Sequence, residues 1–214
     1  MAITRLHSQL RQAIEEARAG VQQHPAHGLS PFYRKQIYDL IGPMAERPSR
    51  CIRAQLAIIS AQRIAFIWGE SRPQDDRIDQ LITLAKDILR DTVIKEVAEK
   101  MAGEAWDWLT NDYGDRNEEL HDGALYVMAA ALEAVFASLG VDRFHNVIID
   151  QNMTDTDLDP WCSDTALYAA AALAGPLWEP GSSSERRKEF WEWWLSEAIL
   201  SAHQRCESSG YAAQ

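Results

Sequence analysis

Residues 50–68 read RCIRAQLAIISAQRIAFIW, and this stretch determines the fold class of the chain. At helical spacing, Ile52, Leu56 and Ile59 lie on one side. A second side carries Ala54, Ala57, Ile58, Ala61 and Ala65. A helix that is apolar on most of its circumference has to be enclosed by other elements. We therefore expect a buried central helix over about 50–68, with a narrow polar strip formed by Arg53, Gln55, Gln62 and Arg63.

Apolar residues recur at helical spacing on both sides of this stretch. They predict further helices over residues 3–19, 31–41, 78–89, 92–112, 122–139, 163–174 and 186–203. Ser30 precedes Pro31 as an N-cap, and Gly42 with Pro43 ends that helix. Ser182 to Glu185 is a capping-box pattern before the last helix.

Three segments carry more specific expectations. The helix at 92–112 has an apolar face made of Val93, Val97, Met101, Ala105 and Trp108. On the last helix, the residues expected to dock on the core are Phe190, Trp191, Trp194, Leu195 and Ala198. Residues 144–149 are either a short strand or the end of a helix. Since no strand-rich region is found, we predict an all-α, single-domain bundle of seven or eight helices over residues 1–214.

The composition excludes several classes of protein. With 214 residues and 46% apolar residues, the chain can build a full core. It has no apolar run of 18 residues, and its first twelve residues lack the apolar centre of a signal peptide. Cys51, Cys162 and Cys206 are scattered and odd in number, which predicts free thiols. We therefore expect a cytoplasmic protein that does not enter a membrane.

The net charge of −11 is concentrated in two short segments. Glu104–Asp122 has seven acidic residues and one basic residue, and Asp150–Asp164 has five acidic residues and no basic one. A field of this sign repels nucleic acid and attracts a basic partner. The alternative is that these acidic segments only keep the protein soluble.

The strongest catalytic alternative is a metal site. Glu118 and His121, like Asp142 and His145, are spaced to share a helix face, and such pairs bind metals in helical bundles. The scheme also needs two more inward glutamates; Glu133 is one candidate, but a further ligand is not obvious. Asp155, Asp157 and Asp159 suggest a calcium loop, but Pro160 and Ala166 stand where that loop needs Gly and Glu. The sequence Asp159-Pro160-Trp161 and Asp164 fit better as the entry to the next helix, where an acid caps free N–H groups. No marked nucleophile is present.

Two segments resemble a known family. In the first, Ile67 and Trp68 end the central helix and are followed by Pro73-Gln-Asp-Asp-Arg77. In the second, Asp155–Asp164 leads to an alanine run, then to Pro176-Leu-Trp178 and Phe190-Trp-Glu-Trp-Trp-Leu195. Together they resemble the all-helical immunity proteins (the fifth numbered family) of bacterial polymorphic toxin systems. The resemblance covers roughly Pro48 to Ser201 and leaves residues 1–47 outside it.

The resemblance implies a protein without a cofactor or catalysis that binds a cognate toxin domain and blocks it. A carboxylate-rich surface suits a basic toxin cleft, because it can take the place of phosphates. We expect the partner-binding residues to be Asp112, Asp115, Glu118, Glu119, Asp155, Asp157, Asp159, Trp161 and Trp193. A third hypothesis is a helical scaffold or homodimer with Trp193 and Leu200 at its seam, although packing of both within the chain is favoured.

Overall fold

The computed structural model describes residues 7–112, 122–141, 143–144, 147–158 and 163–208, and these contain helices but no strand. The helices are α1 (Ser8–Gln23), α2 (Pro31–Ile41), α3 (Arg47–Ser71), α4 (Arg77–Leu89), α5 (Lys95–Asp107), the π-helix η2 (Trp108–Asp112), α7 (Asp122–Leu139), the 3-10 helix η3 (Asp155–Asp157), α8 (Thr165–Ala174), α9 (Ser184–Trp193), the π-helix η5 (Trp194–Ala198) and α10 (Ile199–Ser208). Because α9, η5 and α10 are continuous, as are α5 and η2, the described chain holds eight long helical rods and one 3-10 turn. This confirms the predicted all-α bundle.

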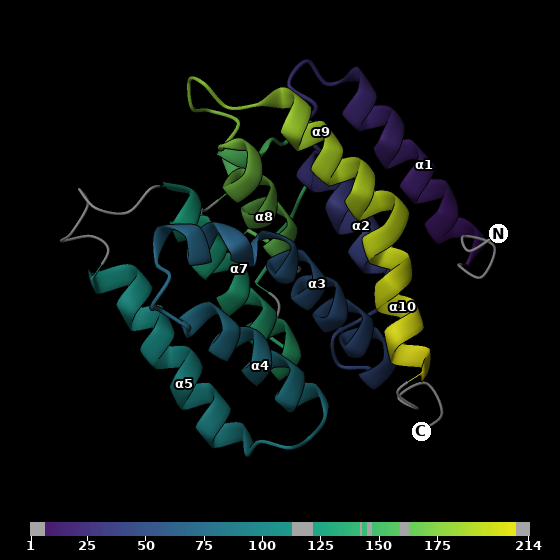
Figure 1. Ribbon diagram of the computed structural model, residues 1–214. Coiled ribbons are helices and arrows are strands. Elements are labelled where there is room, and N and C mark those ends of the chain that lie inside the picture. Colours follow the sequence, from purple (N-terminus) through teal and green to yellow (C-terminus); the bar gives the residue numbers. More distant parts are fainter. Residues whose placement is uncertain (1–6, 113–121, 142, 145–146, 159–162, 209–214) are drawn as a thin grey trace.

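The α3 helix lies at the centre of the bundle, as predicted. It packs against α4, α7, α8 and α10, and Figure 1 shows it crossing the middle of the molecule. Ile58, Ala61 and Ile64 are completely buried. The predicted polar strip is wrong at Arg53, which is buried. Its guanidinium donates a hydrogen bond of 2.6 Å to the carbonyl of Tyr38 and lies over the Tyr38 ring, so the chain itself replaces water around this charge.

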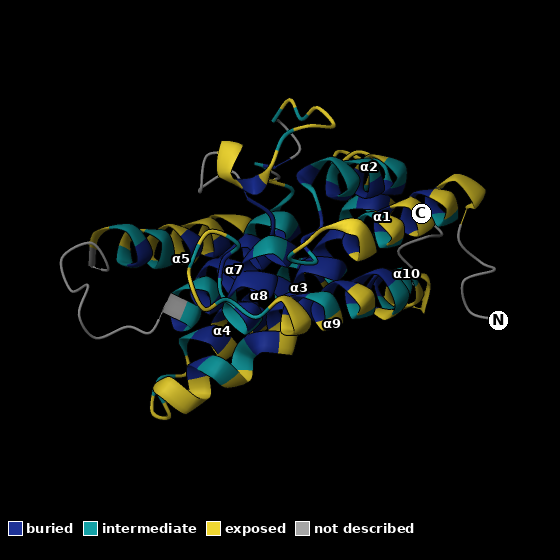
Figure 2. Ribbon diagram, turned by 90° about the horizontal axis from the view of Figure 1, so that it is seen from above, coloured by how far each residue is buried: buried dark blue, intermediate teal, exposed yellow. Residues whose placement is uncertain are grey.

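The remaining helices cover two flanks of α3, α7 and α8. The first flank consists of α1, α2 and the α9–α10 rod, and the second consists of α4 and α5 (Figure 1). Figure 2 shows the buried residues concentrated on α3, α7 and α8 and the exposed ones on the outer helices. The five residues predicted to dock from the last helix are all buried, which confirms that prediction.

The helix ends follow the sequence closely, with small displacements. The Ser30 hydroxyl accepts from the amide of Phe32, and Gly42 ends α2 at a φ of 114°, a left-handed conformation that favours glycine. At α9 the capping residue is Ser183, not Ser182, and its hydroxyl accepts from the amide of Arg186. The first helix continues past Gly20 to Gln23.

The α5 helix is rotated relative to the apolar face read from the sequence. Ala98, Ala102 and Leu109 are buried, whereas Val97 and Met101 are 48% and 38% exposed. The α5 helix packs against α7, and small side chains at a contact allow two helices to lie close together. The alanines therefore face the core, and part of the apolar face stays at the surface.

The prediction of free thiols is wrong for two of the three cysteines. Cys51 on α3 and Cys206 on α10 form a disulfide with 6.0 Å between their Cα atoms. Their separation of 155 residues hid this contact, because only the packing of α10 on α3 brings them together. The third residue, Cys162, lies outside the described residues.

Two other predictions can be compared with the described chain. Within 144–149, the residues that the structure describes form turns and irregular backbone, and no strand is present there. Among the helices described, none is both long and apolar enough to cross a membrane.

Candidate functional site

The acidic segment at 150–158 is fixed to the bundle by a buried ion cluster around Arg34. Arg34 lies on α2 and is 0% exposed. Its Nε donates to Asp164 at 2.7 Å, its Nη2 donates to Asp155 at 2.5 Å, and its Nη1 donates to the carbonyl of Leu29 at 2.6 Å. All three nitrogens of the planar guanidinium thus donate hydrogen bonds, and this planar set of donors makes arginine suited to buried carboxylates.

Aromatic rings and charges complete the surroundings of Arg34. Its Cζ lies 5.3 Å from the ring centre of Phe144 and 5.8 Å from that of Trp191. Burial alone would lower the pKa of Arg34, but the carboxylates of Asp155 and Asp164 outweigh burial and raise it. Arg34 therefore remains charged and joins segments that are 121 and 130 residues away in the chain.

Asp155 and Asp164 consequently have structural contacts. The Asp164 carboxylate binds Arg34 and also caps α8, since it accepts from the amide of Leu167 at 2.9 Å. The prediction that Asp164 is the acid at a helix entry is confirmed. Asp155, which we predicted as part of a partner-binding surface, is buried with its carboxylate on Arg34.

The neighbouring acids of the segment face solvent. Asp157 is exposed, and its carboxylate accepts from the backbone amide of Thr154 at 2.8 Å and from the Thr154 hydroxyl at 2.7 Å. These two hydrogen bonds lower the pKa of Asp157, so it stays ionised. Asp150 is also exposed. The buried carboxylate of Asp155 therefore holds a loop whose outer side carries negative charge.

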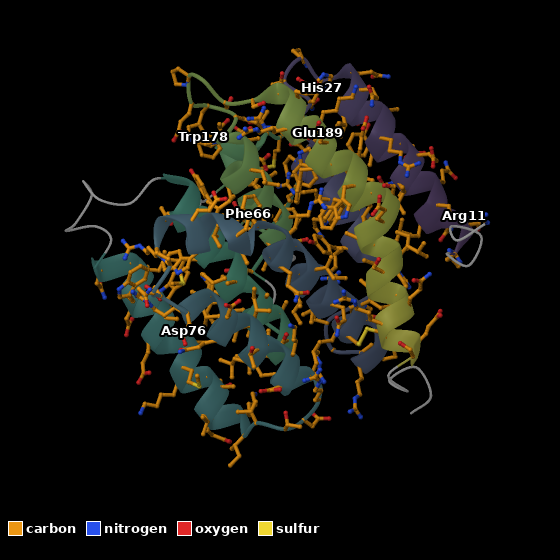
Figure 3. The ribbon with its side chains drawn as sticks, viewed as in Figure 1. Arg11, His27, Phe66, Asp76, Trp178 and Glu189 are labelled. Carbon is orange, nitrogen blue, oxygen red and sulfur yellow. A yellow bond between two sulfur atoms is a disulfide. The ribbon has the colours of Figure 1, made fainter. Side chains whose placement is uncertain are left out.

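A hollow of about 310 Å³ lies directly beside this loop. Three aromatic residues line it: Tyr126 from α7, Tyr168 from α8 and Trp178 from the α8–α9 connection. The tyrosine rings are stacked at 6.4 Å with an interplanar angle of 25°. Trp178, which Figure 3 labels, is 52% exposed. The other lining residues are Asp155, Thr156, Leu158, Ser163, Leu167 and Ala171.

A second cluster accounts for the Trp and Asp-Asp-Arg segment at the end of α3. The Trp68 indole donates to the carbonyl of Asp75 at 3.0 Å. The Arg77 guanidinium donates to the Asp75 carboxylate at 2.6 Å and lies 4.1 Å from the ring centre of Trp108. This motif therefore joins the end of α3, the start of α4 and η2. The side chains of Trp68, Asp75 and Arg77 make contacts within the fold.

Comparison with known proteins identifies the family. The family described as Immunity protein Imm5 matches residues 14–201, which is most of the chain. The chain belongs to the Imm5 family. The match begins inside α1, so it includes α2 and Arg34, which the resemblance read from the sequence left outside. No curated protein sequence matches the chain.

Few of the predicted partner-binding residues of this Imm5 protein lie in the described part of the chain. Asp157 is exposed. Trp193 is half-buried, since it packs against Phe190 and lies under the guanidinium of Arg63 at 4.6 Å. Trp193 therefore has packing contacts within the chain, and the dimer seam with Leu200 stays a prediction. Asp112 ends η2, and its side chain is not described. Asp115, Glu118, Glu119, Asp159 and Trp161 lie outside the described residues.

The metal hypothesis falls largely on the same segments. Glu118, His121, Asp142 and His145 lie outside the described residues. Glu133 is buried and lies 3.8 Å from Arg143. Within the ranges that the structure describes, no group of three or more His, Cys, Asp or Glu residues is placed to hold a metal.

Sequence reasoning missed the residues that organise this region of the Imm5 protein. Arg34, Tyr126 and Tyr168 were not considered as site residues. One signal was available for Arg34: it shares the helical strip of Ile37, Tyr38 and Ile41, which is buried. An arginine in register with a buried strip indicates a partner of opposite charge.

Proposed function

We propose that this Imm5 family member neutralises a cognate toxin domain by binding it, without catalysis. The observation that carries the proposal is the family match over residues 14–201. The architecture supports it, because a rigid helical body holds an acidic loop through the buried Arg34 cluster. A pre-organised surface loses little conformational freedom on binding, which favours affinity.

The charge of the surface gives the class of partner. Asp150 and Asp157 are exposed, and the segment from 150 to 164 contains no basic residue. Such a surface attracts a basic toxin domain at long range and raises the association rate at low salt. Asp112, Asp115, Glu118, Glu119, Asp159, Trp161 and Trp193 complete the proposed partner-binding set, with the carboxylates steering association and the aromatic residues anchoring the complex.

Co-expression tests the proposal. The proposed toxin domain should arrest growth when it is expressed alone, and growth should recover when the chain is expressed with it. Growth arrest that persists at equal expression of both proteins would refute toxin neutralisation.

A matched pair of double variants tests the role of the acidic loop. Asp150→Asn with Asp157→Asn removes two exposed carboxylates from the loop, and should slow association with the toxin and flatten its salt dependence. Glu185→Gln with Glu189→Gln removes two exposed carboxylates from α9, so this control variant has the same net charge as the loop variant. Equal on-rates and equal salt slopes for the two variants would remove the loop from the proposal.

The compartment is a separate question. A cytoplasmic location was predicted from the sequence and stays a prediction. The Cys51–Cys206 disulfide argues for an oxidising compartment, since disulfides rarely persist where glutathione and thioredoxin keep thiols reduced. Because Cys51 and Cys206 are buried, the cells are lysed directly into denaturant with a thiol reagent, and the mass of the chain is then measured. One modified cysteine per chain indicates an oxidising compartment, and three indicate the cytoplasm.

A further inference from the structure

We propose that the hollow lined by Tyr126, Tyr168 and Trp178 binds the side chain of one arginine or lysine from the toxin. This inference rests on the proposed function and adds the contact that would anchor the complex. The hollow lies between α7, α8 and the α8–α9 connection, beside the outer side of the acidic loop.

The size of the hollow favours one inserted side chain. Its volume of about 310 Å³ is at the lower end of the range of small-molecule sites, and is too small for a docked helix. Interface anchors are commonly large side chains that fill such pockets, and arginine is among the most frequent. Trp178 at the rim can cover the inserted group, since half of its surface is exposed.

The walls suit a cation. Tyrosine and tryptophan faces carry negative charge density, and a guanidinium or ammonium within about 6 Å of such a face is attracted to it. Within this chain, Arg77 over Trp108 at 4.1 Å and Arg63 over Trp193 at 4.6 Å show the same pairing. The aliphatic stem of the inserted side chain would lie against Leu158 and Leu167.

The charges around the hollow also favour a cation. Below it, the Arg34 cluster holds two carboxylates against one guanidinium. The nearby Arg187 is directed away, with its guanidinium donating to the carbonyls of Ala26 and Gly175. The outer loop adds the exposed Asp150 and Asp157. Burial, and then the carboxylates of Glu133 and Asp164, raise the pKa of Tyr168, while Arg143 acts in the opposite direction.

An apolar side chain would fit the same walls, so the test has to separate charge from shape. The probes are butylguanidinium and butylurea, which have nearly the same size and planarity but differ in charge. Each is titrated into the purified chain at constant ionic strength, and binding is followed by the NMR signal of the Trp178 indole. We expect saturable binding of butylguanidinium that is at least fivefold tighter than that of butylurea.

Two variants locate the bound probe. Trp178→Ala removes one wall and should weaken butylguanidinium binding roughly two- to fivefold, read from the other signals of the hollow. Phe66→Ala is the matched control, because Phe66 on α3, which Figure 3 labels, is 54% exposed and is not among the lining residues of the hollow. Equal binding of both probes, or equal effects of both variants, would overturn the inference.

The result is distinguishable from failure of the proposed function. If the chain neutralises the toxin but the hollow does not prefer the guanidinium, this inference falls and the proposed function stands. If the hollow binds butylguanidinium selectively but no toxin domain is neutralised, the preference of the hollow for a cation stands, while the proposed function, and with it the toxin as the source of that cation, falls.

Discussion

Two aspartates two residues apart should respond to the same substitution in different ways. Asp155 is buried, and its carboxylate receives two hydrogen bonds from Arg34, whereas Asp157 is exposed and bonds to Thr154. Removing one partner of a buried ion pair typically costs about 3–5 kcal/mol. Because Asp164 still holds the Nε of Arg34, we expect Asp155→Asn to cost about 3 kcal/mol, the lower end of that range.

Thermal and urea unfolding of the oxidised protein measure this difference. At roughly 2–4 °C per kcal/mol for a chain of this size, Asp155→Asn should lower Tm by about 6–12 °C. Asp157→Asn should lower it far less, since water can replace its exposed contacts, and should instead slow association with the toxin. Equal changes in Tm for the two variants would refute the division between a structural and an outward-facing acid.

Three further predictions concern the rest of the fold. Replacing Cys51 and Cys206 with serine should lower the free energy of unfolding by about 2–5 kcal/mol in urea titrations, because the disulfide closes a long loop in the unfolded chain; an unchanged midpoint would contradict this. For Asp75, burial raises the pKa, but the hydrogen bonds from Arg77 outweigh it, so the pKa lies below the usual value of 3.8. Its contribution to stability is then present above that value and lost as the pH falls through the lower folded pKa. An Asp75→Asn variant should therefore lose less stability in this acid range than the wild type. Acid unfolding of both proteins is followed by circular dichroism, and an equal loss of stability in the two would exclude the effect. On α5, Ala102→Leu should cost about 1–3 kcal/mol by overpacking against α7, while Met101→Ser should change stability by about 0.5 kcal/mol or less; the reverse order in unfolding experiments would show that the sequence-based face is the buried one.

Local features were predictable from the sequence. The α3 helix is apolar almost all round, and this alone indicates enclosure by other helices. Ser30, Gly42 and Asp164 act within a few residues of their own positions, so turn and cap rules identify them.

Features that depend on distant parts of the chain were not predictable. The Arg34 cluster needs α2, η3 and the start of α8 to meet, and no spacing rule connects residues more than 120 positions apart. The same holds for Cys51 and Cys206. The buried face of α5 was predicted wrongly because periodicity identifies the apolar residues but not which of them pack most closely. Small residues such as Ala98 allow a neighbouring helix to approach, so they lie in the contact.

Acidic composition alone also overstates the partner-binding surface. Five acids lie in Asp150–Asp164, but Asp155 and Asp164 are bound to Arg34 inside the bundle. A test that neutralised Asp155 together with its neighbours would unfold this region and mimic a loss of binding. Asp150 and Asp157 are therefore the residues to change.

Titration of toxin activity against increasing amounts of this chain tests most directly whether neutralisation is binding. The account predicts that activity falls in proportion to added protein, reaches zero at a fixed stoichiometric ratio, and returns when the complex is separated. Complete inhibition by a small fraction of an equivalent, increasing with incubation time, would mean that the chain modifies the toxin catalytically and would contradict the account.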